Sequence, residues 1–554
     1  TIANLDFTRD EYLELDRSKQ AWPADQAAAD SLWRKRIKSE VLNLKLAGKA
    51  PEEIPPLLKK RFNNQLHRVQ QYSSEDVYQT YLNALTELYD PHTNYLSPRT
   101  SENFNINMSL KLEGIGAVLQ ADDEYVKVVR LVPAGPADKQ GQLQPADRIV
   151  GVGEGKSGDI QDVVGWRLDD VVDLIRGPRD SVVRLEVIPA KAAVEDRRKL
   201  IEITRNEVKL EEQSAQKKVL EIWHGERSVK VGVIDVPAFY IDFEAMRNGD
   251  PEFKSTTRDV YKLLTELMQE GVEGVVIDLR NNGGGSLQEA NALTGLFIDS
   301  GPTVQIRHSS SRVIREGKQR SSPFYDGPLV VLINRLSASA SEIFAGAIQD
   351  YQRGVVIGGQ SFGKGTVQSL SPLAHGQLKL TESKFYRISG DSTQNRGVLP
   401  DIALPELYDY SKVGEGALDN ALPWDRIKPA PHRVYFDIQD GLPQLIDRHT
   451  ARIARDPDFV YLNDQLQMLK KNRSITRLSL NEAQRRAQRD QDRAQQLAIE
   501  NKRRQAKGLE PLATLDEDEA EDELTVADDT RTGIKDNDPV LTEAAHVLAD
   551  TLQI

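Results

Sequence analysis

Two residues 25 positions apart, Ser339 and Lys364, have the chemistry required of a nucleophile and its general base. Ser339 lies between an apolar run typical of a buried strand (residues 328–333) and a helical pattern over residues 338–351. A serine in the first turn of a helix faces unpaired backbone N–H groups and the positive end of the helix dipole. Both stabilise the negative oxygen that forms when a serine attacks a carbonyl. The pattern predicts a nucleophile at a strand-to-helix turn.

Lys364 follows a second apolar run, residues 354–358, and stands between Gly363 and Gly365. Burial disfavours the ammonium form of a lysine and lowers its pKa, so a desolvated amine can take a serine proton at neutral pH. If residues 364–368 are extended, Gln368 lies on the same face as Lys364, because side chains alternate along a strand. We therefore predict that Lys364 is the general base and that Gln368 orients its amine.

A glycine-rich loop is the third element of the predicted site. The string DLRNNGGG (residues 278–285) follows an apolar strand pattern, and its glycines expose backbone N–H groups. We predict that the amides of Gly284 and Ser339 form an oxyanion hole. Taken singly, these patterns are more often an N-cap, a loop lysine and a turn. Their order along the chain favours one joint site.

Other polar residues near the predicted site have less direct interpretations. Glu342 is expected to be a structural acid of the first helical turn, with a bond to the neighbouring loop as the alternative. Asp350 is expected to be structural, because eleven residues of helix place it about 16 Å from Ser339. Ser361 matches the G-x-S-x-G string, but no helix pattern follows it. The histidines show no paired context, so a histidine-based triad is not favoured.

Composition excludes several classes of function. The chain has 554 residues, of which 39% are apolar and 28% charged, and its net charge is −13, which does not indicate a nucleic-acid partner. The absence of cysteine excludes disulfides and thiolate chemistry, and without an HExxH string we predict no metal and no cofactor. No apolar run is long enough for a transmembrane segment. Because the sequence begins at Thr1, its start says nothing about export.

The periodicity changes three times along the chain and predicts four domains. Residues 1–107 are helical, with helices over 27–46 and 74–88, and residues 108–190 contain short β-rich runs with one helix over 168–176. Residues 191–406 alternate strands with helices over 257–270, 286–297 and 338–352, after a charged connection at 191–227, which predicts a layered α/β core. Residues 407–554 are helical again. They include a polar helix over 479–507, opened by a capping box at Ser479, and an acidic run at 516–523.

The β-rich second domain has the pattern of a PDZ domain. Gly114, Ile115 and Gly116 stand at the head of its first long strand, where neighbouring backbone N–H groups are expected to hold a terminal carboxylate. The edge of that strand can then pair with an extended peptide. This domain is therefore predicted to bind protein substrates by their free apolar C-termini.

Several strings occur together in the order found in one known family: YDPHTNYLS, RNNGGG, SASASE, FGKGTVQ, KFYRI and GVLPD, with the PDZ-like segment after the first of them. On these strings the sequence resembles the carboxy-terminal processing, or tail-specific, proteases, most closely those of the proteobacterial periplasm, over nearly its whole length. The resemblance implies a multidomain α+β protein whose protease core has a crotonase-like (ClpP/crotonase) fold.

The resemblance also implies an ATP-independent serine endopeptidase, with Ser339 as nucleophile, Lys364 as base and Gln368 as orienting partner. It places the protein in the periplasm of a Gram-negative bacterium, near the periphery of the inner membrane, with a periplasmic or lipoprotein adaptor as a further partner. Two alternatives stay open. One is a PDZ scaffold with an inactive crotonase-like domain, and the other is a crotonase-type acyl-CoA enzyme, which would require a carboxylate acid/base pair.

Overall fold

The computed structural model of the protein describes residues 5–18, 20–191, 198–318, 321–515, 534 and 537–553, so the acidic run at 516–523 lies outside the described residues. The N-terminal part is helical, with α1 (Gln26–Leu46), α2 (Ile54–Gln70) and α3 (Ser74–Thr86) after the short strand β1 (Tyr12–Glu14). Asp25 caps α1, and Ser73 and Asp76 form a capping box on α3. The two helices predicted in this region are confirmed.

The helical part is joined to the rest of the molecule by β2 (Asn94–Leu96) and α4 (Pro98–Ser109). β2 comes from the YDPHTNYLS string and pairs antiparallel with β19 (Gln377–Tyr386). A segment near the N-terminus therefore becomes part of the sheet that contains β18 (Thr366–Pro372), the strand that begins two residues after the predicted base Lys364.

The PDZ domain contains a sheet in the order β4-β5-β6-β8-β9, with the small strand β7 beside β6. Alternate residues of its strands point inward and are buried, as the period of two predicts. Its elements are β3 (Lys111–Gly114), β4 (Ala117–Asp122), β5 (Tyr125–Leu131), α5 (Pro136–Gln140), β6 (Arg148–Glu154), β7 (Ile160–Asp162), α6 (Leu168–Ile175) and β8 (Val182–Ile188).

Part of the predicted charged connection belongs to this domain. β9 (Lys199–Thr204) pairs with β8, and β10 (Asn206–Lys209) pairs with β3. These two strands have a buried apolar face, because apolar residues alternate along them with exposed polar ones. The buried residues are Ile201, Ile203 and Val208. The interpretation of these residues as a connection alone was wrong, because the polar residues between them hide the alternation.

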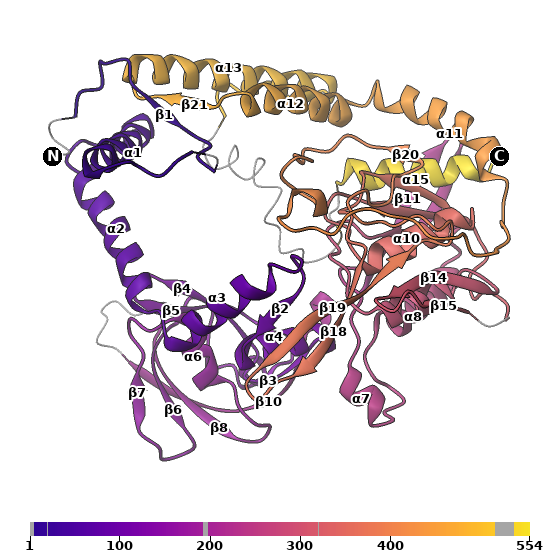
Figure 1. Ribbon diagram of the computed structural model, residues 1–554, viewed down its shortest axis with the longest axis horizontal. Helices are drawn as coiled ribbons and strands as arrows, with labels where there is room; N and C mark the ends of the chain where they lie inside the picture. Colours follow the sequence, from indigo (N-terminus) through magenta and orange to yellow (C-terminus); the bar gives the residue numbers. More distant parts are fainter. Residues whose placement is uncertain are drawn as a thin grey trace.

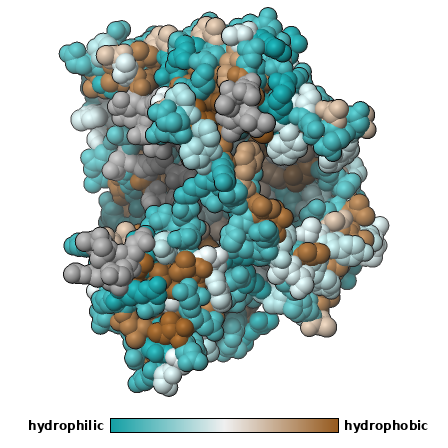
Figure 2. Space-filling view, turned by 90° about the vertical axis from the view of Figure 1, so that its left-hand side faces the viewer, coloured by the Kyte–Doolittle hydropathy of each residue, from teal (hydrophilic) through white to brown (hydrophobic). Residues whose placement is uncertain are grey.

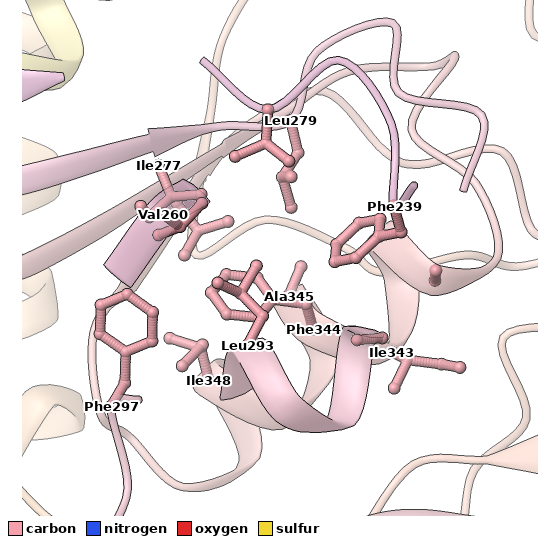
Figure 3. Close-up of a cluster of buried hydrophobic side chains, with 14 of the residues drawn as sticks. Phe239, Val260, Ile277, Leu279, Leu293, Phe297, Ile343, Phe344, Ala345 and Ile348 are labelled. Atoms are coloured by element: carbon pink, nitrogen blue, oxygen red, sulfur yellow. The ribbon is translucent and has the colours of Figure 1, made fainter. Parts of the chain in front are cut away.

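The α/β core is a six-stranded sheet in the order β11-β12-β13-β16-β17-β20, parallel from β12 onward. Helices α8 and α9, together with α10, which begins after the predicted nucleophile, cover one face with a continuous apolar core (Figure 3). The other face packs against the C-terminal helix and its neighbours. The predicted strands and helices of the α/β core are confirmed. These elements are β11 (Gln216–His224), β12 (Arg227–Asp235), α8 (Thr256–Gln269), β13 (Gly274–Asp278), α9 (Leu287–Thr294), β16 (Leu329–Ile333), α10 (Ala340–Asp350), β17 (Val355–Gly358) and β20 (Ile402–Ala403).

A second sheet, in the order β15-β14-β19-β18, extends from the core towards the PDZ domain (Figure 1). It includes β14 (Gly301–His308) and β15 (Val313–Lys318). The remaining short elements of this part are α7 (Phe243–Arg247) and the single turns of 3₁₀ helix at Glu211–Gln213 and Glu415–Ala417.

The C-terminal helices connect the core back to the N-terminal part. α11 (Ile438–Ile453), α12 (Pro457–Arg473) and α13 (Glu482–Ala506) lead along the top of the molecule in Figure 1 to α1, and β21 (Arg477–Ser479) pairs with β1. α15 (Pro539–Thr551) returns to the core sheet. The predicted capping box at Ser479 was wrong, because Ser479 lies in β21 and the side chain of Asn481 caps α13 instead.

Candidate active site

The three predicted site loops meet at one edge of the core sheet. β13, β16 and β17 are parallel neighbours, so the loops that follow them leave from the same carboxyl edge. Hydrogen bonds join the first two loops: the amide of Asn281 donates to Asn334 Oδ1 at 2.9 Å, and the amide of Ala338 donates to the carbonyl of Asn282 at 3.0 Å. The third loop is tied in by the amide of Phe362, which donates to the carbonyl of Ser337 at 2.9 Å.

Ser339 occupies the N-cap of α10 in an unusual backbone conformation. Its φ is 57° and its ψ is −109°, a combination that residues other than glycine rarely adopt. Such strain persists where surrounding contacts hold it and is concentrated at functional sites. Directly beside it, Gly284 has a φ of +104°, and a Cβ added there would lie 2.9 Å from Ser339 Cβ. Only glycine can bring this loop so close to the predicted nucleophile.

Both amides predicted for the oxyanion hole already have acceptors. The N–H of Ser339 donates to Glu342 Oε2 at 2.7 Å, and the N–H of Gly284 donates to Asn282 Oδ1 at 2.8 Å. Among the described residues, the neighbouring amides of Gly285 and Ala340 have no hydrogen-bond acceptor. The structure therefore offers free donors one residue beyond each of the two predicted positions.

Lys364 is partly buried beside the site, and burial lowers the pKa of its amine to about 8. The nearby positive charge of Lys379 lowers this pKa further, whereas the carboxylates of Glu415 and Glu342 act in the opposite direction. No hydrogen bond joins the Lys364 amine to Ser339 Oγ in the described part of the chain. An amine with this pKa is partly neutral near pH 7, as a general base requires.

The side chain of Gln368 forms hydrogen bonds with two threonines and not with Lys364. Its Nε2 donates to Thr366 Oγ1 at 2.8 Å and to Thr381 Oγ1 at 3.0 Å. Thr381 Oγ1 in turn donates to Asp90 Oδ1 at 3.0 Å. The side chains of Thr366 and Gln368 are therefore in contact on β18, and Thr381 links them to the N-terminal YDPHTNYLS segment. Lys364 precedes this strand, so the predicted shared face of Lys364 and Gln368 stays a prediction.

Glu342 is fully buried and connects the nucleophile loop to the base loop. Besides the amide of Ser339, it accepts hydrogen bonds from the amides of Gly363 (2.7 Å) and Lys364 (2.9 Å) and from the hydroxyl of Ser361 (2.6 Å). Burial raises the pKa of Glu342 to about 7, although all four donors act to lower it. Both predicted roles of this acid, in the helix start and in the loop, are present in the same side chain.

The remaining serines of the region are structural in their contacts. Ser337 Oγ donates to the carbonyl of Leu279 at 2.8 Å, and Ser341 Oγ donates to the carbonyl of Asn282 at 2.9 Å. No helix begins after the loop that contains Ser361, so this serine does not have the strand-to-helix turn of a nucleophile elbow.

Asp350 lies at the far end of α10 and forms an ion pair with Arg387 at 2.5 Å. This contact fits the structural role expected of it.

Four residues that shape the site were not predicted from the sequence: Asn282, Asn334, Asp90 and Lys379. Asn334 directly follows β16, so an amide at the end of a buried strand was the available signal for it, whereas Asn282 lies within the RNNGGG string, four residues after β13. Asp90 lies in the YDPHTNYLS string, which predicts no separate role for this residue. Nothing in the sequence around Lys379 indicates that it lies near Lys364.

The predicted carboxylate-binding segment links β3 to β4 in the PDZ domain. Gly116 has a φ of +73°, and the side chain of Ile115 is buried in the domain core. In the described residues, the amides of Ile115 and Gly116 have no hydrogen-bond acceptor. β4 is an edge strand of its sheet, so its outer edge is available to an added peptide strand. The arrangement suits a peptide C-terminus.

Four family models match the chain in succession. They are the tail specific protease N-terminal domain over residues 2–99, the PDZ domain over 103–188, peptidase family S41 over 230–404, and the C-terminal domain of tail specific protease over 408–553. In the part of the chain that the structure describes, none of the helices is both long and apolar enough to cross a membrane.

Proteins similar in sequence to this chain are described as tail-specific or carboxy-terminal processing proteases. The tail-specific protease of Haemophilus influenzae is 42% identical over 526 residues, which cover 92% of this chain and 72% of the relative. The carboxy-terminal processing protease CtpA of Bacillus subtilis is 29% identical over 59% of this chain and 64% of its own length.

Two solved structures are also similar. The photosystem II D1 C-terminal processing protease is 27% identical over 62% of this chain and 87% of its own, with a TM-score of 0.34. The PDZ domain of the carboxy-terminal protease from Vibrio cholerae, solved in complex with a peptide, is 48% identical over 18% of this chain and 100% of its own, with a TM-score of 0.17.

Proposed function

The chain belongs to the tail-specific protease family and is a C-terminal processing serine peptidase of family S41, and we propose that Ser339 is its nucleophile and Lys364 its general base. The observation that carries the proposal is the strained backbone of Ser339 at the start of α10. The loop that contains Lys364, whose pKa is lowered, lies at the same edge of the core sheet.

The proposed reaction proceeds through an acyl-enzyme. Lys364 Nζ takes the proton of Ser339 Oγ as this oxygen attacks the scissile carbonyl, and the resulting ammonium then protonates the leaving amine. The neutral amine of Lys364 then deprotonates a water molecule, which attacks the ester carbonyl. The ammonium returns this proton to Ser339 Oγ as the ester C–O bond breaks and the product leaves with a new carboxyl group. No nucleotide enters these steps, so the proposed endopeptidase is ATP-independent.

Backbone amides stabilise the oxyanion in this proposal. The predicted donors are Gly284 and Ser339, and each must first leave its present acceptor, Asn282 or Glu342. The neighbouring free amides of Gly285 and Ala340 need no such change. Catalysis also requires the Lys364 amine to form a hydrogen bond with Ser339 Oγ. In this arrangement Gln368 gives up one of its hydrogen bonds to a threonine hydroxyl and binds the Lys364 amine instead. Such hydrogen bonds often tighten only when substrate is bound.

We further propose that the amides of Gly114, Ile115 and Gly116 hold the C-terminal carboxylate of a protein substrate, while β4 pairs with its tail. The free amides of Ile115 and Gly116 and the open edge of β4 support this. Proteins with small apolar C-terminal residues are the proposed substrates. The proposed location is the periplasm of a Gram-negative bacterium, at the periphery of the inner membrane, with an adaptor lipoprotein as the proposed carrier of substrates. This location and the adaptor rest on the family resemblance.

Matched protein substrates that differ only in a free or an amidated C-terminus test this function. Amidation removes the charge and one acceptor oxygen, so the free-acid substrate should be cut faster below saturation. Ser339→Ala should abolish cleavage of both, and full activity in that variant would show that another residue is the nucleophile. No cleavage of either substrate by the unmodified protein would favour the alternative in which the crotonase-like domain is inactive. Equal cleavage of the two substrates by the unmodified enzyme would show that the terminus is not read.

A further inference from the structure

A cavity of about 1370 Å³ lies between the N-terminal helices and the PDZ domain. One wall consists of residues from α2 and α3, and the other consists of the end of β4, the turn that follows it and the segment leading into α6. It is larger than the usual pocket for a small ligand. None of the residues assigned above to catalysis or to carboxylate binding lines it.

The cavity continues the peptide groove of the PDZ domain. A PDZ ligand pairs with the edge of the strand that follows the carboxylate-binding loop, and its carboxylate lies at the start of that strand. When the ligand is antiparallel to β4, its upstream residues run towards Ala121. Ala121 and the first helical residues of α6, Leu168 and Asp169, line the cavity. Both sides of the groove therefore open into it at the upstream end.

The length of β4 sets how much of a tail the groove can hold. β4 has 6 residues, and a paired strand advances about 3.3 Å per residue, so the groove accommodates about six residues of a ligand. The next residues upstream must leave the groove where the cavity begins.

Contacts across the cavity hold its walls in place. Lys60 of α2 forms an ion pair of 2.7 Å with Asp123 of the β4–β5 turn, and Gln71 Nε2 donates to the carbonyl of Gly165 at 2.8 Å. Arg167 forms an ion pair of 2.5 Å with Asp76 of α3. Two ion pairs, Lys60–Asp123 and Arg167–Asp76, therefore cross the cavity, and its other charged lining residues are mostly acidic.

The lining also offers exposed aromatic rings. The side chains of Tyr72 and Trp166 are 63% and 44% exposed. More generally, this side of the molecule is mainly hydrophilic, with apolar residues gathered in separate patches (Figure 2). Aromatic rings that are exposed without a partner in the chain are typical anchors for a bound polypeptide.

We propose that this cavity is a second binding site for the substrate, which holds the extended polypeptide immediately upstream of the six-residue tail. It would bind apolar side chains of the substrate on Tyr72 and Trp166. The proposal rests on the function proposed for the PDZ domain, since the tail must first be bound there.

Binding of two synthetic peptides to the full-length Ser339→Ala protein tests the site. One has six residues and ends in small apolar residues, and the other adds ten residues of alternating valine and serine upstream of the same six. The longer peptide should bind at least about fivefold more tightly. Tyr72→Ala, and Ala84→Arg, which adds bulk to the exposed cavity wall on α3, should each remove most of that gain without changing the affinity for the short peptide.

Tyr81→Ala is the matched control, because Tyr81 is 69% exposed on α3 but does not line the cavity. It should keep the advantage of the long peptide. Equal affinity for the two peptides, or a gain that survives both cavity variants, would overturn the proposal. Failure of the short peptide to bind would instead contradict the tail-reading role of the PDZ domain, so the two failures are distinguishable.

Discussion

Glu342 accepts a hydrogen bond of 2.7 Å from the backbone N–H of Ser339, three residues before it. The same carboxylate oxygen accepts the backbone N–H of Lys364 at 2.9 Å. One fully buried side chain thus fixes the spacing between the backbones of the proposed nucleophile and base. It also occupies one of the two amides predicted for the oxyanion hole, so its position decides whether that donor is free.

Replacing Glu342 with glutamine should impair both folding and catalysis. An amide keeps the shape but presents an NH₂ donor to groups that are themselves donors, which leaves buried hydrogen bonds unmade at a cost of about 3 kcal/mol. Denaturant unfolding and peptide hydrolysis measure the two effects. Glu289→Gln is the matched control, because Glu289 is also a buried first-turn acid and accepts the amide of Thr257, but on α9. It should lower stability and leave kcat nearly unchanged, whereas an equal loss of kcat in both variants would contradict a specific role for Glu342.

The stability of the protein should depend on the ionisation of Glu342. Burial raises the pKa of this group to about 7, above the unfolded value of roughly 4.3. The folded state therefore binds the proton more tightly than the unfolded state. The resulting stabilisation is complete below the unfolded pKa and is lost as pH rises towards 7, by an amount on the order of 3 kcal/mol.

Unfolding free energies of Ser339→Ala and of Ser339→Ala with Glu342→Gln, measured from pH 4 to pH 8, test this dependence. The difference between the two proteins should shrink as pH rises, because only the first protein loses the contribution of a protonated Glu342. A difference that is constant or grows over this range would show that Glu342 is ionised throughout.

Much of this site follows from the order of local patterns. Each of the three site strings, which contain Gly284, Ser339 and Lys364, follows an apolar strand. The carboxyl ends of parallel neighbouring strands lie at the same edge of the sheet. The hydrogen bonds that occupy the amides of Gly284 and Ser339 could not be predicted in the same way, because they depend on where the side chains of Asn282 and Glu342 point after packing.

Long-range pairing is the other feature that local patterns do not contain. β2 pairs with β19 from more than 280 residues away, and this brings Asp90 to Thr381. The strands β9 and β10 were missed for a different reason, since charged residues alternate with the few apolar ones that are buried. Both cases involve partners or faces that only the folded chain defines.

Removing the positive charge of Lys379 should change the pH dependence of catalysis. Lys364 acts only when its amine is neutral, so the rate should rise with pH through a pKa near 8. Lys379 lowers that pKa by repulsion, and Lys379→Met should therefore raise it. The acidic limb of kcat/KM should move to higher pH, while the rate at high pH is retained.

Lys262→Met, at an exposed lysine of α8, is the control for Lys379→Met and should leave the profile in place. An acidic limb that stays fixed, or moves to lower pH, in Lys379→Met would contradict the proposed influence of this charge on the base.

Thr381→Val should slow catalysis without weakening the binding of tails. The change removes the hydroxyl that accepts from Gln368 Nε2 and donates to Asp90, so the Gln368 side chain loses one of the two hydrogen bonds that fix its position. A fall in kcat of about tenfold is expected. Thr381→Ser retains the hydroxyl and should restore most of the rate. If both variants were equally slow, the loss would come from packing of the methyl group rather than from the hydrogen bonds.

The central claim is that Ser339 is the nucleophile and is activated by Lys364, and covalent labelling tests it most directly. The full-length protein is treated with a fluorophosphonate ester, digested and mapped by mass spectrometry. We predict a single adduct on Ser339, with Ser337, Ser341 and Ser361 unlabelled, and its rate of formation should fall by at least about 100-fold in Lys364→Met. An adduct on another serine, or labelling of Ser339 at an unchanged rate in Lys364→Met, would contradict the account.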